Sequence, residues 1–446
     1  MKNKLCLVVL LVVSFGEIAE LSSDFKTLLR DITPNFEENL NRAFRNEAVR
    51  NHHKRKTYVH KIDNTFMSLG ETKIELRNLK FPWIPDFRIN YMSANLPMLC
   101  LDVSFKLGAL RIDGEFEANN FTLQKLLPVS NNGKIAILFK EVVVQGKIGL
   151  LIEEDSLKPT NYDLNFINNE TEITVSYFVD DENEIENKIT KSNGEQSLGD
   201  SVWGQLTDIL TELLHRQLAE VVVEFSLTEL LVDQDEHLRD IFREHSNRAN
   251  RLLDSLLCKA KDYLVAKNHR SVKTPAFDVI FRGKPSGLEQ GMLKTEDGYV
   301  QDLSTLSRMQ GLSLYEDDND LVVYGSLTLR EFKHGYEKYR STFEGNKISG
   351  SIRTSIYKNK IFVKIVIRKK PELCHTRLET VQANTVKDID VDASGLASLS
   401  WLVPRLEAWV IANLRYQTLP VLEKYIKEAF DHAINSTDCI ALIADA

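Results

Sequence analysis

The stretch KISGSIRTSIYKNKI, residues 347–361, has the alternating pattern of a strand, a turn and a second strand. A similar stretch, KIAILFKEVVVQGKI, occupies residues 134–148, which lie 213 positions earlier in the chain. Both begin with Lys-Ile, repeat Lys-Ile after the same interval and carry apolar residues at matching places. The sequence therefore predicts the same β-hairpin at the middle of each half.

The pattern around these two stretches also repeats. In each half a helical pattern comes first, alternating strands follow, and a long amphipathic helix ends the half. Under the constant offset of 213 the matching apolar positions are Ile135, Phe139, Val143, Ile148, Leu150 and Ile152 with Ile348, Ile352, Ile356, Ile361, Val363 and Ile365. The matching order predicts an α+β fold of two tandem rolls, each a long helix wrapped by a strongly curved antiparallel sheet, with a second helix per repeat.

The helices are predicted from apolar residues spaced three and four apart. In the first half such stripes run from Leu21 to Phe44 and from Trp203 to Phe225, and in the second half from Leu238 to Leu264. The last helix is expected over about 396–430. Pro404 suits the first turn of this helix, whereas Pro420 should kink its interior.

Two polar segments between the predicted strands of the first half are interpreted as connections. The triplet NNG, residues 131–133, is a strong hairpin signal. The acidic segment DENEIEN, residues 181–187, is expected to be a solvated loop. It lacks the glycine and the ordered alternation of a calcium-binding loop.

Composition and charge limit the class of protein. The 446 residues are 43% hydrophobic and 27% charged, which is enough apolar material for a large core and too much for a disordered chain. The formal net charge of −8 argues against nucleic-acid binding, because phosphate contacts need a basic surface.

The first residues have the order of a secretory signal. Lys2 and Lys4 precede the apolar run LCLVVLLVVSF, and small residues follow at Gly16 and Ala19. No later stretch approaches eighteen unbroken apolar residues, so no transmembrane segment is expected. We therefore predict a signal peptide at 1–19, a first domain at 20–232, a second domain at 233–446, and a secreted, extracellular protein.

Export places the remaining cysteines in an oxidising compartment. Cys100, Cys258, Cys374 and Cys439 remain after removal of the signal, and they are compatible with two disulfides in any of three connectivities. Cys258–Cys439 is favoured, because both residues lie on or beside predicted helices of the second half. Three glycosylation acceptor sequences also follow the signal, at Asn120, Asn169 and Asn435.

No enzyme motif emerges from the chain. It has no G-x-S-x-G elbow, no H-E-x-x-H and no phosphate-binding loop. His215 and His334 have no carboxylate or cysteine at a sequence spacing typical of a catalytic or metal site, so each is interpreted as a surface or hydrogen-bonded histidine. No catalytic residue, metal site or cofactor is predicted, although a hydrolase without a recognisable motif stays open.

The predicted rolls suggest a binding function instead. An apolar roll that its own side chains do not fill lowers the stability of the protein by about 24 cal/mol for each Å³ of cavity. A lipid-like guest would restore about 0.8 kcal/mol of stability for each CH₂ group that it buries there. The candidates to line such a cavity are Leu101, Val103, Phe105, Leu107, Leu206, Leu210, Leu213, Leu214, Val221, Leu327, Leu329, Ile352, Leu406, Val410, Leu414 and Leu422. The simpler interpretation of the same residues is an ordinary filled core.

Two segments of the second half carry a resemblance to a known family. Both resemble segments of the group-seven mite allergens. They are MQGLSLYEDDNDLVVYGSLTLREFKHGYEKY, residues 309–339, and GLASLSWLVPRLEAWVIANL, residues 395–414. The resemblance covers 235–434 most clearly and 21–231 more faintly. Those allergens share a tubular lipid-binding (TULIP) fold with insect juvenile-hormone-binding proteins and with the bactericidal/permeability-increasing proteins, whose two-roll length this chain also resembles. The chain lacks the proline-rich centre of the bactericidal/permeability-increasing proteins and the N-terminal cysteine pair of the hormone carriers.

The resemblance implies non-covalent binding of a lipid, lipopolysaccharide or another apolar small molecule, without chemistry. We therefore expect a secreted carrier or sensor of such molecules. The alternative is a secreted scaffold or innate-immune recognition protein that binds bacterial lipopolysaccharide or a protein partner. Peripheral contact with lipid surfaces, the head group of the ligand and the oligomeric state are left open by the sequence.

Overall fold

The computed structural model of the chain describes residues 33–47, 59–69, 72–82, 85–118, 132–153, 156–180, 183–192, 200–223, 225, 236–282, 290–309, 311–317, 320–343, 346–370, 373–396, 402–439 and 442. In these residues the protein is an α+β fold with two antiparallel nine-stranded sheets, one from each half. The predicted signal peptide, the predicted boundary at 232/233 and Asn120 lie outside the described residues.

The first sheet has its longest strands at its centre. Its main path runs in the order β1-β3-β5-β6-β8-β9, with β2 paired to β3, β4 to β5 and β7 to β6. The strands are β1 (His60–Lys61), β2 (Thr65–Leu69), β3 (Thr72–Phe81), β4 (Arg88–Asn95), β5 (Cys100–Ala118), β6 (Asn132–Glu153), β7 (Ser156–Ile167), β8 (Glu170–Asp180) and β9 (Asn183–Ser192).

The second sheet is built in a related way. Its main path is β10-β12-β16-β17-β15-β13, with β11 paired to β12, β14 to β15 and β18 to β17. The strands are β10 (Val272–Thr274), β11 (Asp278–Arg282), β12 (Gln290–Gln301), β13 (Leu306–Arg308), β14 (Ser313–Asp317), β15 (Asp320–Leu329), β16 (Phe332–Phe343), β17 (Asn346–Lys370) and β18 (Leu373–Ala393).

The two stretches with the matching sequences occupy corresponding places. They lie in β6 and β17, each of which pairs with long strands on both sides. Leu101 of β5 pairs with Ile148, and Leu327 of β15 pairs with Ile361, the residue at the predicted offset from Ile148. The repeated sequence pattern thus corresponds to a repeated strand position.

The hairpins predicted for these stretches are wrong, because each stretch is part of one continuous strand. Strand β6 bends at Glu141, whose φ is 52°, and continues. In β17 the polar residue Asn359 lies opposite the break between β15 and β16. There its side-chain amide donates to the carbonyl of Leu329 at 2.9 Å, and its Oδ1 accepts from the N–H of Leu329 at 2.8 Å. Asn359 therefore completes backbone pairing where the partner strand changes.

Two predicted connections of the first half also differ. Asn132 and Gly133 of the NNG triplet are paired in β6, opposite Glu117 and Phe116. The predicted acidic loop contains the beginning of β9, where Asn183 pairs with Asp180. In both cases pairing with a long neighbouring strand overrides the local turn preference.

The long helices are where the apolar stripes place them. They are α3 (Asp200–Val222), α5 (Glu236–Ala266), α6 (Val403–Asn413) and α7 (Leu419–Asn435), and residues 33–47 form a further helix. Pro404 lies in the first turn of α6, as predicted. The π-helical segment η5 (Leu414–Thr418) separates α6 from α7 and ends just before Pro420, which has no N–H to donate.

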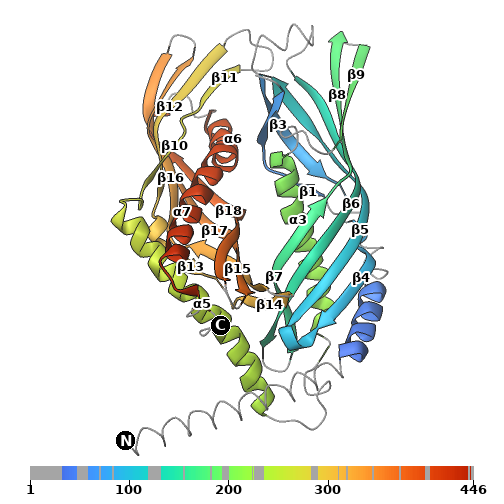
Figure 1. Cartoon of the computed structure of the whole chain (residues 1–446). Coiled ribbons are helices and arrows are strands. Elements are labelled where there is room, and N and C mark those ends of the chain that lie inside the picture. Colours follow the sequence, from blue (N-terminus) through green and yellow to red (C-terminus); the bar gives the residue numbers. More distant parts are fainter. Residues whose placement is uncertain are drawn as a thin grey trace, which may run out of the picture.

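The helices bury apolar residues against the sheets in separate clusters. In the first half α3 and the helix of residues 33–47 pack on the sheet, with Phe44 stacked on Phe105 at 5.2 Å. In the second half α5 and α7 pack together with β18, and α6 contributes to another cluster through Trp409 and Val410. Figure 1 shows α3 and the α6–α7 segment between the two sheets.

The disulfide predicted as Cys258–Cys439 is instead Cys374–Cys439, with a Cα–Cα distance of 5.7 Å. Cys439 follows the end of α7, which packs on β18, and Cys374 is near the beginning of β18. Cys258 is an exposed free thiol on α5. Cys100 is a buried free thiol packed with Tyr315 where the halves meet. The structure thus has one disulfide among the described residues rather than two.

Polar contacts join the two halves along their length. Asn161 of β7 donates to the carbonyl of Gly311 at 2.8 Å, and Lys364 of β17 pairs with Asp163 at 2.8 Å. Further along, Trp409 Nε1 donates to the buried carboxylate of Glu75 at 3.2 Å. In addition, α3 of the first half contacts β18 of the second.

Candidate functional site

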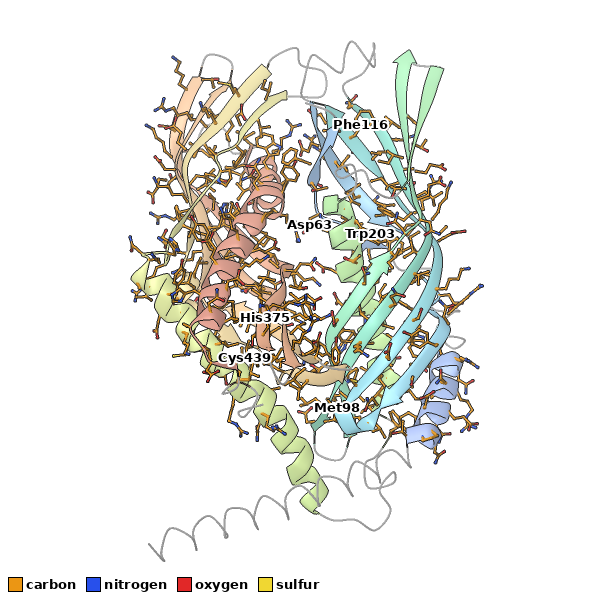
Figure 2. The ribbon with its side chains drawn as sticks, viewed as in Figure 1. Asp63, Met98, Phe116, Trp203, His375 and Cys439 are labelled. Atoms are coloured by element: carbon orange, nitrogen blue, oxygen red, sulfur yellow. A yellow bond between two sulfur atoms is a disulfide. The ribbon has the colours of Figure 1, made fainter. Side chains whose placement is uncertain are left out.

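A cleft of about 500 Å³ lies between the halves. The first half contributes β1 and one side of α3 to its walls, and the second half contributes β18, α6 and η5. Figure 2 shows Asp63 in the space between α3 and α6. The lining residues are His60, Lys61, Asp63, Gln205, Asp208, Ile209, Glu212, Leu213, Arg216, Thr385, Val386, Lys387, Asp388, Ile389, Ile411 and Arg415.

Helix α3 has two faces because residues three and four apart lie on the same side of a helix. One face consists of Leu206, Leu210, Leu214 and Leu218, all fully buried in the first core. The cleft face consists of Gln205, Asp208, Ile209, Glu212, Leu213 and Arg216. The same helix therefore forms the core of one half and a wall of the cleft.

Ion pairs cross the cleft and fix its two walls. Lys387 Nζ lies 2.6 Å from Glu212 Oε2, and Arg415 pairs with Asp63. Arg415 Nη2 also donates to the carbonyl of Val386 at 2.9 Å. Lys387, Glu212 and Asp63 are about half exposed, so each pair contributes only about 0–1 kcal/mol and mainly orients the charged groups.

Burial and neighbouring charges shift the pKa values of three residues that line the cleft. Desolvation raises the pKa of Asp208 to about 7, although Arg415 and Lys387 oppose the shift. Burial also lowers the pKa of His60, and the hydrogen bond from Lys387 lowers the pKa of Glu212. Near neutral pH the cleft thus holds fixed cations and anions together with one carboxyl, Asp208, that is close to half-protonated.

The floor of the cleft is apolar and belongs to both halves. Ile209, Ile389 and Ile411 are partly exposed, whereas Leu213 and Val386 are buried. Leu213 is part of the first core and Val386 is part of a core cluster of the second half. Both apolar interiors therefore reach the cleft beneath its charged rim.

Replacing Asp208 with asparagine is expected to raise the free energy of unfolding at pH 8 by about 1–2 kcal/mol and to leave it nearly unchanged at pH 4. The folded-state pKa of about 7 lies above the unfolded value of 3.8, so the fold favours the protonated carboxyl. That stabilisation is complete below about pH 4 and is lost as the pH rises through 7. Water reaches part of this side chain, so the expected gain is smaller than the full pKa difference alone would give.

Urea unfolding at pH 4, 6 and 8 measures this effect, with Asp388→Asn on the exposed side of the cleft as the control. A gain of the same size at pH 4 and pH 8 would show that Asp208 does not titrate differently in the folded state.

The residues predicted to line a cavity are all buried, and of them Leu213 lines the cleft. The structure brings the nine candidates of the first half into one cluster. It divides those of the second half between two clusters, one with Leu327, Leu329, Leu414 and Leu422 and another with Ile352, Leu406 and Val410. The predicted set is thus part of the packed core, and whether it also contacts a ligand stays a prediction.

The sequence did not indicate the charged residues of the cleft. They come from segments as far apart as His60 and Arg415 and meet only when the halves pack. The one local signal is on α3, where Asp208 and Glu212 follow each other at helical spacing beside the apolar stripe. His215, on the same helix, contacts the hydroxyl of Tyr162 at 2.8 Å through Nδ1.

Other predicted features are found at the surface or outside the described residues. Asn169 is exposed between β7 and β8, and Asn435 is exposed at the end of α7, so both are accessible to glycosylation. The helices within the described ranges are too short or too polar to cross a membrane. In the same ranges no three His, Cys, Asp or Glu side chains are grouped as a metal site would require.

Comparisons with known proteins complete this description. No family model matches the chain, and no curated protein matches it significantly. Among solved structures, one titled "Crystal structure of lipopolysaccharide binding protein" is similar over 90% of each chain, with 8% identity and a TM-score of 0.15. The P47 protein of Clostridium botulinum E1 is similar over 83% of each chain, with 9% identity and a TM-score of 0.12. At such TM-scores neither protein indicates what this chain binds.

Proposed function

We propose that the protein binds amphipathic, lipid-like molecules non-covalently in the cleft between its halves, as a carrier or sensor. The observation that carries this proposal is the joint lining of the cleft, where Leu213 of the first core and Val386 of the second lie beneath a charged rim. A volume of about 500 Å³ is within the range of small-molecule sites.

The lining favours a guest with an apolar part and a polar head. Ile209, Ile389 and Ile411 offer partly exposed apolar surface, and each methylene buried against such surface contributes about 0.8 kcal/mol. Lys387 and Glu212, which pair with each other across the cleft, can exchange that pairing for the two charges of a zwitterionic head. The cleft therefore suits an amphipathic molecule better than a purely apolar one.

The proposal includes three points that the sequence suggested. The protein is secreted after removal of a signal peptide, it performs no chemistry on its ligand, and each half is a roll of the tubular lipid-binding type. The two antiparallel sheets, each with long helices on one face, support the last point.

Native mass spectrometry of the secreted protein, followed by solvent extraction, tests the proposal directly. We expect an adduct of lipid size that organic solvent removes, and a midpoint of thermal unfolding that rises when the extracted molecule is added back. A protein without any adduct, whose stability does not respond to fatty acids or phospholipids, would favour the scaffold interpretation instead.

The variant Ile411→Asp is expected to weaken binding of the extracted lipid at least about tenfold, because it places a carboxylate against the apolar part of the guest. Ile411 is partly exposed on α6, so the fold should tolerate the change. Isothermal titration of the delipidated protein measures the affinity. Tyr357→Asp, at a side chain that is 71% exposed on β17, serves as the control and should bind like the wild type. Unchanged affinity in Ile411→Asp would place the ligand elsewhere.

A further inference from the structure

Most charged residues that line the cleft already pair with a residue of opposite charge. The pairs are Arg415–Asp63, Lys387–Glu212, Arg216–Glu212 and Lys358–Asp388. Two other charged lining residues, Lys61 and Asp208, have no ion-pair partner in the described part of the chain. Lys61 is exposed, so water hydrates its ammonium group, whereas Asp208 is partly buried. Asp208 therefore presents a charge to the cleft that neither the chain nor bulk water fully compensates.

Helix α3 places Asp208 next to apolar surface. The cleft face of this helix consists of two adjacent rows, in which residues follow each other at intervals of four. One row is charged and the other mainly apolar; they are Asp208, Glu212 and Arg216, and Gln205, Ile209 and Leu213. Gln205 is engaged by the backbone, since its Oε1 accepts from the N–H of Asp63 at 3.0 Å. A molecule lying along the apolar row would thus have its head beside Asp208.

The cations around Asp208 do not complete it. The charged groups that face it are Glu212 of α3, Lys387 of β18, Arg415 of η5 and Lys360 of β17. Lys387 and Arg415 contact other carboxylates, and Lys360 is exposed to solvent. None of them donates a hydrogen bond to Asp208, so desolvation outweighs their attraction and raises the pKa of this carboxyl to about 7.

The chemistry of a carboxylate limits what can pair with Asp208. An ionised carboxylate only accepts hydrogen bonds, so its partner must be a donor. A primary ammonium group donates three, and hydrogen bonds between charged groups are about twice as strong as neutral ones. A phosphate, sulfate or carboxylate head would instead lie against a like charge. The unpaired carboxylate therefore favours a head with an ammonium group.

We infer that the cleft selects amphipathic amines, with the ammonium group of the ligand paired to Asp208 and its alkyl chain packed on Ile209, Ile389 and Ile411. An amine bound in this way leaves the pair between Lys387 and Glu212 in place. A zwitterionic head can put its ammonium group in the same position. The inference rests on the proposed binding of amphipathic molecules in the cleft and names the head group that the cleft selects.

Binding of the amine should strengthen as the pH rises, because the ammonium group pairs with the ionised form of Asp208. With a pKa of about 7, the ionised fraction of this carboxyl increases from about one tenth at pH 6 to about nine tenths at pH 8. Burial lowers the pKa of His60, so this imidazole loses its charge at a lower pH than Asp208. An alkylamine, with a pKa near the value of about 10.4 for lysine, stays charged throughout. The affinity for the amine should therefore rise about tenfold from pH 6 to pH 8.

Isothermal titration of the delipidated full-length protein with octylamine and 1-octanol, which have chains of equal length, tests the inference. At pH 8 the wild type is expected to bind the amine about tenfold more tightly than the alcohol. Asp208→Asn should bind the two probes about equally and show no rise in amine affinity from pH 6 to pH 8. Glu220→Gln, at an exposed position of α3 outside the cleft, is the matched control and should keep the wild-type preference. Thermal unfolding checks that both variants are folded.

Three results would overturn the inference, and they can be told apart. If the wild type binds octylamine and 1-octanol equally at pH 8, Asp208 does not select the head group, and the proposed binding in the cleft still stands. If the amine is preferred but Asp208→Asn keeps that preference, the ammonium group binds elsewhere on the protein. If neither probe binds and solvent extraction yields no lipid, the proposed function fails and this inference fails with it.

Discussion

Replacing Leu210 with alanine is expected to lower the free energy of unfolding by about 3–5 kcal/mol. Leu210 is fully buried on α3 within the first core, between helix and sheet. Removing most of its side chain loses the transfer free energy and leaves a cavity that close-packed neighbours cannot fill completely. Urea unfolding of the delipidated protein measures the change.

This experiment distinguishes a packed core residue from one that lines a ligand-filled tube. A side chain that faced a ligand-sized void would lose few contacts on truncation, so the cost in the delipidated protein would fall below about 1.5 kcal/mol. Val223→Ala, just beyond the end of α3 and 52% exposed, is the control and should change stability by less than about 0.5 kcal/mol.

Removing the disulfide with Cys374→Ser is expected to cost about 4 kcal/mol of stability. Cys374 and Cys439 are 65 residues apart, and in the chain-entropy description a loop of this length restricts the unfolded state strongly. The same cross-link holds the segment after α7 to the beginning of β18. Unfolding should therefore begin at a lower urea concentration in Cys374→Ser.

The matched control is Cys258→Ser, which removes the exposed free thiol of α5. We expect a change of less than about 0.5 kcal/mol for this variant, under the same oxidising conditions. A large loss in Cys258→Ser with little effect in Cys374→Ser would mean that the pairing originally expected from the sequence, Cys258–Cys439, forms in solution.

The helices could be predicted from the sequence because their burial is periodic. On α3 the spacing of Leu206, Leu210 and Leu214 reports directly which side meets the core. Pro404 was likewise predictable, since a proline fits the first turn of a helix wherever that helix packs. These features depend on residues within a few turns of one another.

The errors share a different cause. A residue such as Asn359 is polar in the middle of β17 because a neighbouring strand ends beside it, and nothing within the stretch itself indicates that neighbour. The disulfide was wrong for the same reason: the nearness of Cys374 to Cys439 follows from how α7 packs on β18. For His334, interpreted as a surface or hydrogen-bonded histidine, the structure shows full burial and a contact of 3.4 Å from Nε2 to Thr418 Oγ1, a residue 84 positions away.

The sequence by itself determined the α+β class, the alternating strands and the faces of the helices, because a period of two or 3.6 residues is a local property of the chain. Tertiary structure alone decided what those faces meet. His60 and Arg415 line one cleft, and His334 contacts Thr418, only after distant segments pack together. Periodicity records that a side chain is buried, whereas its partners depend on contacts between residues hundreds of positions apart.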